Sequence, residues 1–340
     1  MSVQRKYDYE LMGHEARETH LAMNGASPAG DRVLGFEYWL DGSIKRKQMA
    51  DGNWTGLYAY DLAGRLSSIA NAATPGASEP SSFVASANYN ARGQTTSITY
   101  GNGATSIYSY NDQRGFLTRV LSSNGATTLI DQTYARNAKG MITAIASPQA
   151  GRSWTYGYDS LDRLTSAANA NTPSESRTYA YDDADNMVYN SGLCAGSPNM
   201  VYPAQGSSTP NHPHAPTSIC GTSASYDADG NTLSYDVDGS GPIQPRTIAY
   251  DLENRPFTIT QNANTTKFAY GPDGERASKS FGTTTNYYLG SEAELLVDTA
   301  NPTGLLTSFL HPDITRVGSA TDFSFKDHLA SNRVTLRYSP

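Results

Sequence analysis

Short runs in which apolar or aromatic residues alternate with polar residues follow one another along the whole chain, and most runs end at Gly, Asn or Asp. Tyr58 and Tyr60 enclose one alanine, and Tyr179 and Tyr181 enclose another. A period of two places both rings of each pair on the same face of a β-strand. The pattern therefore predicts many short strands separated by turns, and no long helices.

The strand pattern is an internal repeat of about 24 residues, marked by a tyrosine at the end of one strand. The twelve positions are Tyr9, Tyr38, Tyr60, Tyr89, Tyr110, Tyr134, Tyr158, Tyr181, Tyr202, Tyr226, Tyr250 and Tyr270. The residue four places later is Gly, Asn or Asp in ten copies, which include Gly64, Gly93, Gly206, Gly230 and Gly274. Arg114 and Ala138 are the exceptions. Because these residue types adopt positive φ, the offset predicts a tight hairpin turn after each tyrosine.

Each repeat is thus expected to be two strands and two turns, a hairpin that buries its faces only by stacking on its neighbours. In three repeats an acid follows the tyrosine and an arginine follows the turn, giving the pairs Asp61 with Arg65, Asp159 with Arg163, and Asp251 with Arg255. We interpret them as structural cross-strand pairs, worth roughly 0.2 to 1 kcal/mol each.

Composition supports this interpretation and excludes other classes. The 340 residues include 23 tyrosines, and only 17% are charged, so an intrinsically disordered chain is not expected. A net charge of −7 argues against a nucleic-acid partner. No apolar stretch is long enough for a membrane span, and no signal peptide follows Met1. The two cysteines, Cys194 and Cys220, permit either one disulfide or two free thiols.

Several segments resemble the YD repeats of bacterial Rhs polymorphic toxins, toxin-complex subunits and teneurins. They are residues 60–66 (YDLAGRL), 158–165 (YDSLDRLT) and 226–231 (YDADGN). Residues 214–219 (HAPTSI) are similar to the PHAVTSI segment of Rhs cores, and residues 325–333 (FKDHLASNR) to the DHLGSxR stretch near the end of the repeat region. The resemblance covers nearly the whole chain.

The resemblance implies an all-β fold in which tandem hairpins form one long curved or spiralling antiparallel sheet, an arc of a hollow shell. It implies a division into a YD-repeat strip over residues 1–290 and, over residues 291–340, the end of the repeat region leading into a truncated core segment. In toxin-bearing members the shell encloses a C-terminal toxic domain and is followed by a self-cleaving core with an Asp-Pro-x-Gly type motif. This chain stops before such a motif, so no protease site is expected in it.

Candidate sites are few. Cys194, His212, His214 and Cys220 are metal-ligand types, but their spacing matches no zinc pattern. Acidic turns such as residues 182–185 and 227–231 lack the sixth-position Gly and distal Glu of a calcium loop. No nucleophile elbow, phosphate loop or dinucleotide fingerprint is present. We therefore predict no enzyme, no cofactor and no metal.

The aromatic rows have two interpretations. They are either packing ladders between hairpins, which we favour, or a platform that stacks on sugar rings, for which Trp39, Trp54 and Trp154 are the candidates. The sequence therefore predicts a non-enzymatic scaffold, exported as part of a larger bacterial protein, whose partners are a toxin domain or the remaining Rhs core and a secretion apparatus. The alternative is an extracellular module that binds cell-surface glycans.

Overall fold

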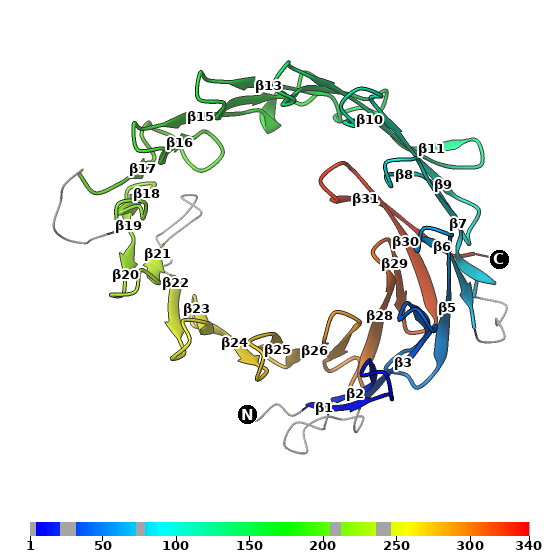
Figure 1. Ribbon diagram of the computed structural model, residues 1–340. Helices are drawn as coiled ribbons and strands as arrows, with labels where there is room; N and C mark the ends of the chain where they lie inside the picture. The colour runs from blue at the N-terminus through cyan, green and yellow to red at the C-terminus, as the bar shows by residue number, and fades with distance from the viewer. Residues whose placement is uncertain (1–4, 21–31, 73–78, 205–211, 236–245, 340) are drawn as a thin grey trace. The chain divides into compact units, whose positions relative to one another are not determined.

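A computed structural model describes residues 5–20, 32–72, 79–204, 212–235 and 246–339 (Figure 1). Within these ranges the chain forms β-strands and one short 3-10 helix, so the predicted all-β fold is confirmed. Each strand pairs with its neighbour in the sequence, and the order is a 16-stranded sheet (β1–β16), a 3-stranded sheet (β17–β19) and a 12-stranded sheet (β20–β31). The antiparallel strip is therefore interrupted between β16 and β20. No helix in the described ranges has the length and apolar character that crossing a membrane requires.

The chain divides into two compact units. The first comprises Met1–Tyr134 and Ala269–Pro340. The strands of its N-terminal part are β1 (Arg5–Tyr9), β2 (Glu15–His20), β3 (Arg32–Tyr38), β4 (Ile44–Gln48), β5 (Trp54–Tyr60), β6 (Leu66–Asn71), β7 (Ser82–Tyr89), β8 (Thr95–Tyr100), β9 (Thr105–Tyr110), β10 (Leu117–Asn124) and β11 (Thr127–Arg136). Those of its C-terminal part are β25 (Arg276–Phe281), β26 (Thr284–Leu289), β27 (Ala293–Val297), β28 (Leu305–His311), β29 (Ile314–Val317), β30 (Ala320–Lys326) and β31 (Asn332–Arg337).

The second unit comprises Ala135–Phe268. Its elements are β12 (Ile142–Ala146), β13 (Trp154–Tyr158), β14 (Leu164–Ala168), the 3-10 helix η2 (Pro173–Glu175), β15 (Arg177–Tyr181), β16 (Met187–Asn190), β17 (Met200–Val201), β18 (Ser218–Ile219), β19 (Thr222–Ser223), β20 (Ser225–Tyr226), β21 (Thr232–Tyr235), β22 (Arg246–Tyr250), β23 (Pro256–Gln261) and β24 (Asn264–Tyr270).

Most of the described turns that follow a repeat tyrosine share one geometry. In the repeat of Tyr60, Gly64 N donates to Asp61 O at 3.0 Å and Asp61 N donates to Arg65 O at 2.8 Å. Gly64 has a φ of 75°, which completes a tight turn followed by a bulge. The register of β5 and β6 shifts at Ala59/Tyr60, so Tyr60 faces Leu66. Positive φ recurs at Gly93, Asp162, Asp185, Gly230, Asn254 and Gly274. Gly206 lies outside the described residues.

The two exceptions to the offset have longer strands or loops. After Tyr110 the loop is one residue longer, and positive φ falls on Gly115, with a value of 70°, instead of on Arg114. Strand β11 runs past Tyr134 to Arg136, and positive φ falls on Gly140, with a value of 94°. Arg136, and not Tyr134, therefore occupies the strand-end position of that repeat.

The first unit has two sheet layers. In Figure 1 the orange and red strands β28–β30 lie beside the blue strands β3–β5, and buried side chains join the layers. Leu34 and Ala50 pack against Leu289 and Ala293. Further along, the ring of Tyr100 meets Phe323 and Phe325 edge to face at centroid distances of 6.0 and 5.4 Å. The side chains of Phe83, Ile69, Ile130 and Ile314 are also fully buried. Apolar burial of this kind is the main stabilising contribution to such a sandwich.

The described part of the second unit has few buried side chains. The buried residues described there are Ile145, Ala167, Asn169, Asn186, Asn199 and Met200, and half of them are asparagines. A strip with so little apolar core depends on contacts between consecutive hairpins. Those contacts are made by the residues that define the repeat.

Candidate functional site

The hydroxyl groups of the repeat tyrosines join each hairpin to the one before it. Tyr60 donates to Ile44 O at 2.9 Å, and Tyr181 donates to Leu164 O at 3.0 Å. Ile44 and Leu164 are the residues paired with the tyrosine of the preceding repeat, Tyr38 and Tyr158. The same kind of bond is made by Tyr38, Tyr89, Tyr110, Tyr158, Tyr202, Tyr226 and Tyr250. We call these bonds the tyrosine staples.

Burial raises the pKa of these hydroxyls, for example that of Tyr181, so they remain donors at neutral pH. Tyr158 donates to Ile142 O, which lies six residues after Arg136, the residue at the strand-end position of the preceding repeat. The sequence pattern predicted a packing role for the rings but no hydrogen-bond partner, because the acceptor is a backbone carbonyl of a different hairpin. In most staples the acceptor lies six residues after the tyrosine of the preceding repeat, and this offset is the signal that could have located it; Pro216, the acceptor of Tyr226, departs from it.

In three repeats the aspartate that follows the tyrosine stabilises the turn through hydrogen bonds. Oδ1 of Asp61 accepts hydrogen bonds from Ala63 N at 2.8 Å and Arg65 N at 3.0 Å, and Oδ2 accepts one from Arg65 Nε at 2.7 Å. The arginine hydrogen bonds hold the pKa of Asp61 below its usual range. Asp159 and Asp251 make the same contacts with Arg163 and Arg255, and hydrogen bonds from the arginine backbone are the largest cause of their lowered pKa values.

The arginines of these pairs also contact the following repeat. The guanidinium of Arg65 lies 4.7 Å from the ring centroid of Tyr89, and Arg163 lies 4.8 Å from that of Tyr181. Nη1 of Arg163 additionally donates to Asp185 Oδ1 at 2.7 Å. A cation over an aromatic face is worth about 0.5 to 1 kcal/mol when partly exposed. Arg65 and Arg163 therefore each link their own turn to the next tyrosine, which sequence reasoning did not foresee.

Asp327, in the segment similar to DHLGSxR, builds another turn of this type. Its Oδ1 accepts from Leu329 N at 2.9 Å and Ser331 N at 3.0 Å, and Arg333 Nε donates to Oδ2 at 2.7 Å. Ala330 takes the positive-φ position with a φ of 60°. This segment therefore repeats the hairpin geometry although it contains no tyrosine.

The three tryptophans differ in their surroundings. Trp39 is 43% exposed, Lys45 Nζ lies 4.9 Å from its ring centroid, and its Nε1 donates to Tyr58 O. The Arg46 guanidinium lies 4.6 Å from the ring centroid of Trp54. Trp39 follows β3 and Trp54 begins β5, so the two lie toward opposite ends of β4. A cation thus lies over a ring face of both, which reduces the area available to a sugar.

Trp154 lies in the second unit at the start of β13. It lines a mainly apolar cavity of about 440 Å³ together with Ile145, Ala168 and Pro173. The cavity offers an apolar wall and the polar atoms of Asn169, whose Nδ2 already donates to Gly151 O at 2.7 Å.

A cavity of about 500 Å³ lies between the two layers of the first unit and is lined by Lys47, Tyr58, Tyr60, Glu292, Phe309 and His311. Its charges pair with each other, because Lys47 Nζ lies 2.8 Å from Glu292 Oε2. Ser291 Oγ contacts Glu292 Oε1 at 3.4 Å, so the carboxylate that could activate this hydroxyl is engaged by Lys47. Burial lowers the pKa of His311, which keeps its imidazole neutral. The arrangement is that of a packed polar interface and not of a nucleophile–base pair.

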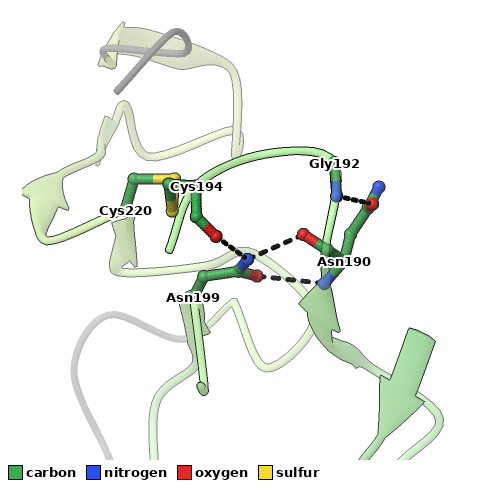
Figure 2. Close-up of a disulfide and its surroundings, with 5 residues drawn as sticks. All are labelled: Asn190, Gly192, Cys194, Asn199 and Cys220. Atoms are coloured by element: carbon green, nitrogen blue, oxygen red, sulfur yellow. Dashed lines mark hydrogen bonds between the residues drawn. A yellow bond between two sulfur atoms is a disulfide. The ribbon is translucent and has the colours of Figure 1, made fainter. Parts of the chain in front are cut away.

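Cys194 and Cys220 form a disulfide with an S–S distance of 2.07 Å, which decides between the two states that the sequence left open (Figure 2). His214 Nδ1 lies 2.8 Å from Asn186 Oδ1, and His212 Nε2 lies 3.3 Å from Asp227 O. The two histidines thus contact neighbouring turns. In the described ranges no group of three His, Cys, Asp or Glu side chains is placed to hold a metal ion.

The acidic turns use their carboxylates internally. Oδ1 of Asp227 accepts from Asp229 N and Asn231 N, and Oδ2 accepts from Asn231 Nδ2 at 2.9 Å. Asp182 makes the equivalent contacts with Ala184 and Asn186. These oxygens hold the hairpin turn together, as expected for a YD turn.

Comparison with known proteins gives consistent results. The family model described as RHS Repeat matches residues 89–127 and 136–174. None of the curated proteins matches significantly. Among solved structures, the crystal structure of TcdB2-TccC3-TEV superposes with a TM-score of 0.70 at 16% identity, over 98% of this chain and 20% of that chain. The crystal structure of TcdB2-TccC3 gives a TM-score of 0.62 at 16% identity, over 97% and 20%.

A pore structure of the Tc holotoxin from Photorhabdus luminescens is also similar, with a TM-score of 0.61 at 16% identity over 99% of this chain and 19% of that chain. This chain spans about a fifth of the length of the structures it matches. Likeness at this identity concerns the fold, and the repeat model identifies the recurring unit. The two matched segments, residues 89–127 and 136–174, are similar to the RHS repeat, and both contain the hairpin turn with a positive-φ residue described above.

Proposed function

We propose that this chain is a non-enzymatic part of an Rhs-type shell that encloses a C-terminal toxin and helps to deliver it. The observation that carries the proposal is that tyrosine staples recur between consecutive hairpins, for example those made by Tyr38, Tyr181 and Tyr250. A strip held together in this way at most of its repeats can be extended without a globular core, and a wall of a large container needs that property.

The similarity to TcdB2-TccC3 structures, whose chains are about five times longer, supports a role as one segment of a larger wall. We further propose that residues 291–340 lead into the core segment of that larger protein, and that the protein is exported with the toxin or the remaining core as its intramolecular partner. A secretion apparatus would then be its external partner.

The test uses the chain together with whatever polypeptide follows it in its reading frame. We expect the following polypeptide to resist added protease while the strip is folded, and to be digested once the strip is unfolded in urea. The same polypeptide produced alone serves as the control and should be digested at once. Equal digestion rates for the two forms, or a stop codon directly after Pro340, would contradict the proposal.

The glycan-binding alternative has its own measurement. A glycan array probed with the purified chain should show no signal that depends on Trp39, Trp54 or Trp154. A hit that disappears when these residues are replaced by alanine would favour a binding module instead of a shell wall.

A further inference from the structure

The weakest part of the strip, judged from its strands, lies in the second unit between the two long sheets. Strands β17, β18, β19 and β20 have two residues each, whereas the strands β12–β15 before them have five. Short strands with few buried apolar neighbours open locally at low free energy. The Cys194–Cys220 disulfide lies in this segment.

Beside the short ladder of β17 and β18, a few backbone hydrogen bonds connect the successive pieces here. Asn199 N donates to Val188 O at 3.0 Å, which joins β17 to β16, and Cys220 N donates to Asn199 O at 2.8 Å, which joins β18 to β17. Thr217 N donates to Val201 O at 2.7 Å on the same pair of strands. Tyr202 also donates to Met187 O, and His214 Nδ1 lies 2.8 Å from Asn186 Oδ1, so the disulfide is the covalent member of a small set of ties that hold the segment.

Asn199 is the centre of the noncovalent ties. Its side chain is nearly buried, at 4% exposure. Its Nδ2 donates to Asn190 O at 2.7 Å and to Cys194 O at 3.3 Å, and Asn190 N donates to its Oδ1 at 3.1 Å (Figure 2). The amide of Asn199 therefore needs the end of β16, the Cys194 loop and β17 to be in place together.

The disulfide shares the Cys194 loop with these noncovalent ties. It joins the Cys194 loop to the turn between β18 and β19 across a separation of 26 residues, with the two Cα atoms 5.9 Å apart. Both cysteines are half-buried, and the adjoining residues 195–198 are exposed, so a small thiol can reach the bond. The covalent and noncovalent ties thus hold one junction, and each keeps the groups of the other in position.

We propose that this disulfide is a redox-sensitive splice of the strip, meaning a covalent cross-link that keeps the two long sheets connected. When it is intact, it carries the connection between the two long sheets across β17–β19. A thiolate from a small thiol or dithiol attacks one cysteine sulfur, forming a mixed disulfide and releasing the other cysteine as a thiolate that takes up a proton. A second thiol then releases the first cysteine, so that two cysteine thiols and one oxidised reductant disulfide result.

The opening that follows reduction is local. The staples and turns of β12–β16 and β21–β24 contain no cysteine and remain formed, whereas the ties around Asn199 lose the constraint that positions them. In a compartment rich in thiols the strip would therefore come apart at this junction while its hairpins stay folded. This inference concerns the strip itself and does not depend on whether a toxin is enclosed.

The test compares amide hydrogen exchange of the oxidised chain before and after complete reduction with a phosphine, which is checked by alkylation and intact mass. Reduction should raise exchange at Thr217, Cys220 and Ala224 by at least about tenfold, because closure of a loop of this length restrains the open state. Amides of β12–β14 should change less than about twofold. A Cys194→Ser/Cys220→Ser double variant should match the reduced chain and should not respond to phosphine.

Three results would overturn the proposal. One is unchanged exchange at the junction after reduction is complete. A second is loss of protection throughout β12–β24 at once, which would make the disulfide a support of the whole unit instead of a splice. A third is that the cysteines stay unpaired after treatment with oxidised glutathione. Since the first two measurements use the wild-type chain, they remain decisive even if the double variant does not fold.

Discussion

Replacing Tyr181 by phenylalanine removes one tyrosine staple and leaves the rest of the hairpin unchanged. The hydroxyl of Tyr181 donates to Leu164 O at 3.0 Å, while the ring stays against the Arg163 guanidinium at 4.8 Å. A net hydrogen bond contributes about 0.5 to 1.5 kcal/mol. Because the carbonyl is half-buried and water can replace the lost donor, we expect the lower part of that range, about 0.5 to 1 kcal/mol.

Hydrogen exchange measures this loss at the hairpin itself. The amides of Asp182 and Ser191 donate to Asn186 O and Thr178 O within the Tyr181 hairpin. A loss of about 0.5 to 1 kcal/mol corresponds to exchange roughly two- to fivefold faster at these two amides. Global unfolding is less informative, because repeat strips do not unfold in a single step.

Tyr9 supplies the matched control. It begins the repeat series, is 64% exposed, and its hydroxyl donates to no group among the described residues. Tyr9→Phe should therefore leave exchange at Glu10 and Gly13 within experimental error. The reasoning is refuted if Tyr181→Phe does not change exchange in its hairpin, or if Tyr9→Phe accelerates exchange as much as Tyr181→Phe does.

Other perturbations follow from the same structure. Gly64→Ala should destabilise its hairpin by about 1 to 2 kcal/mol, measured by hydrogen exchange, because φ is positive at this position. Gly64→Asn should destabilise the hairpin less, since Asn254 occupies the equivalent position in another repeat. The pKa of Asp159 is lowered in the folded state, so its contribution is present above the unfolded value near pH 4 and lost as pH falls through the folded value. Asp159→Asn should therefore reduce the fall in the urea midpoint between pH 7 and pH 3. An unchanged dependence of the midpoint on pH would be evidence against the role assigned to Asp159 in the turn. Burial raises the pKa of Tyr58, so the stability of the fold should hold below about pH 10 and decline above it. Tyrosinate absorbance and circular dichroism, recorded together, measure ionisation and unfolding in this range. Phe323→Ala, at a side chain with 0% exposure, should cost about 3 to 5 kcal/mol in the first unit, whereas Phe257→Ala, at 43% exposure, should cost far less in chemical denaturation.

The features that depend on neighbouring residues in the chain were predictable. Period-two alternation predicts the strands, and the Gly, Asn or Asp four residues after the tyrosine predicts the turn, because both follow from the conformation of a few consecutive residues. The pairing of Asp61 with Arg65 is local in the same sense, since the two residues belong to one hairpin.

Partners contributed by other hairpins required the tertiary structure. Strand length decided that Arg136, and not Tyr134, ends its strand, and register decided that the hydroxyl of Tyr181 reaches Leu164 O. The pairing of Cys194 with Cys220 likewise depends on how β17–β19 bring the two loops together.

The sequence by itself determined the repeating hairpin, because positive φ, a capping carboxylate and alternating faces are requirements of short segments. The tertiary structure alone decided which hairpins gain a second layer, as where Tyr100 packs on Phe323 and Phe325, and where the strip is interrupted and spliced. These outcomes depend on which faces meet after folding, and the sequence of a single repeat does not specify which distant repeats it contacts.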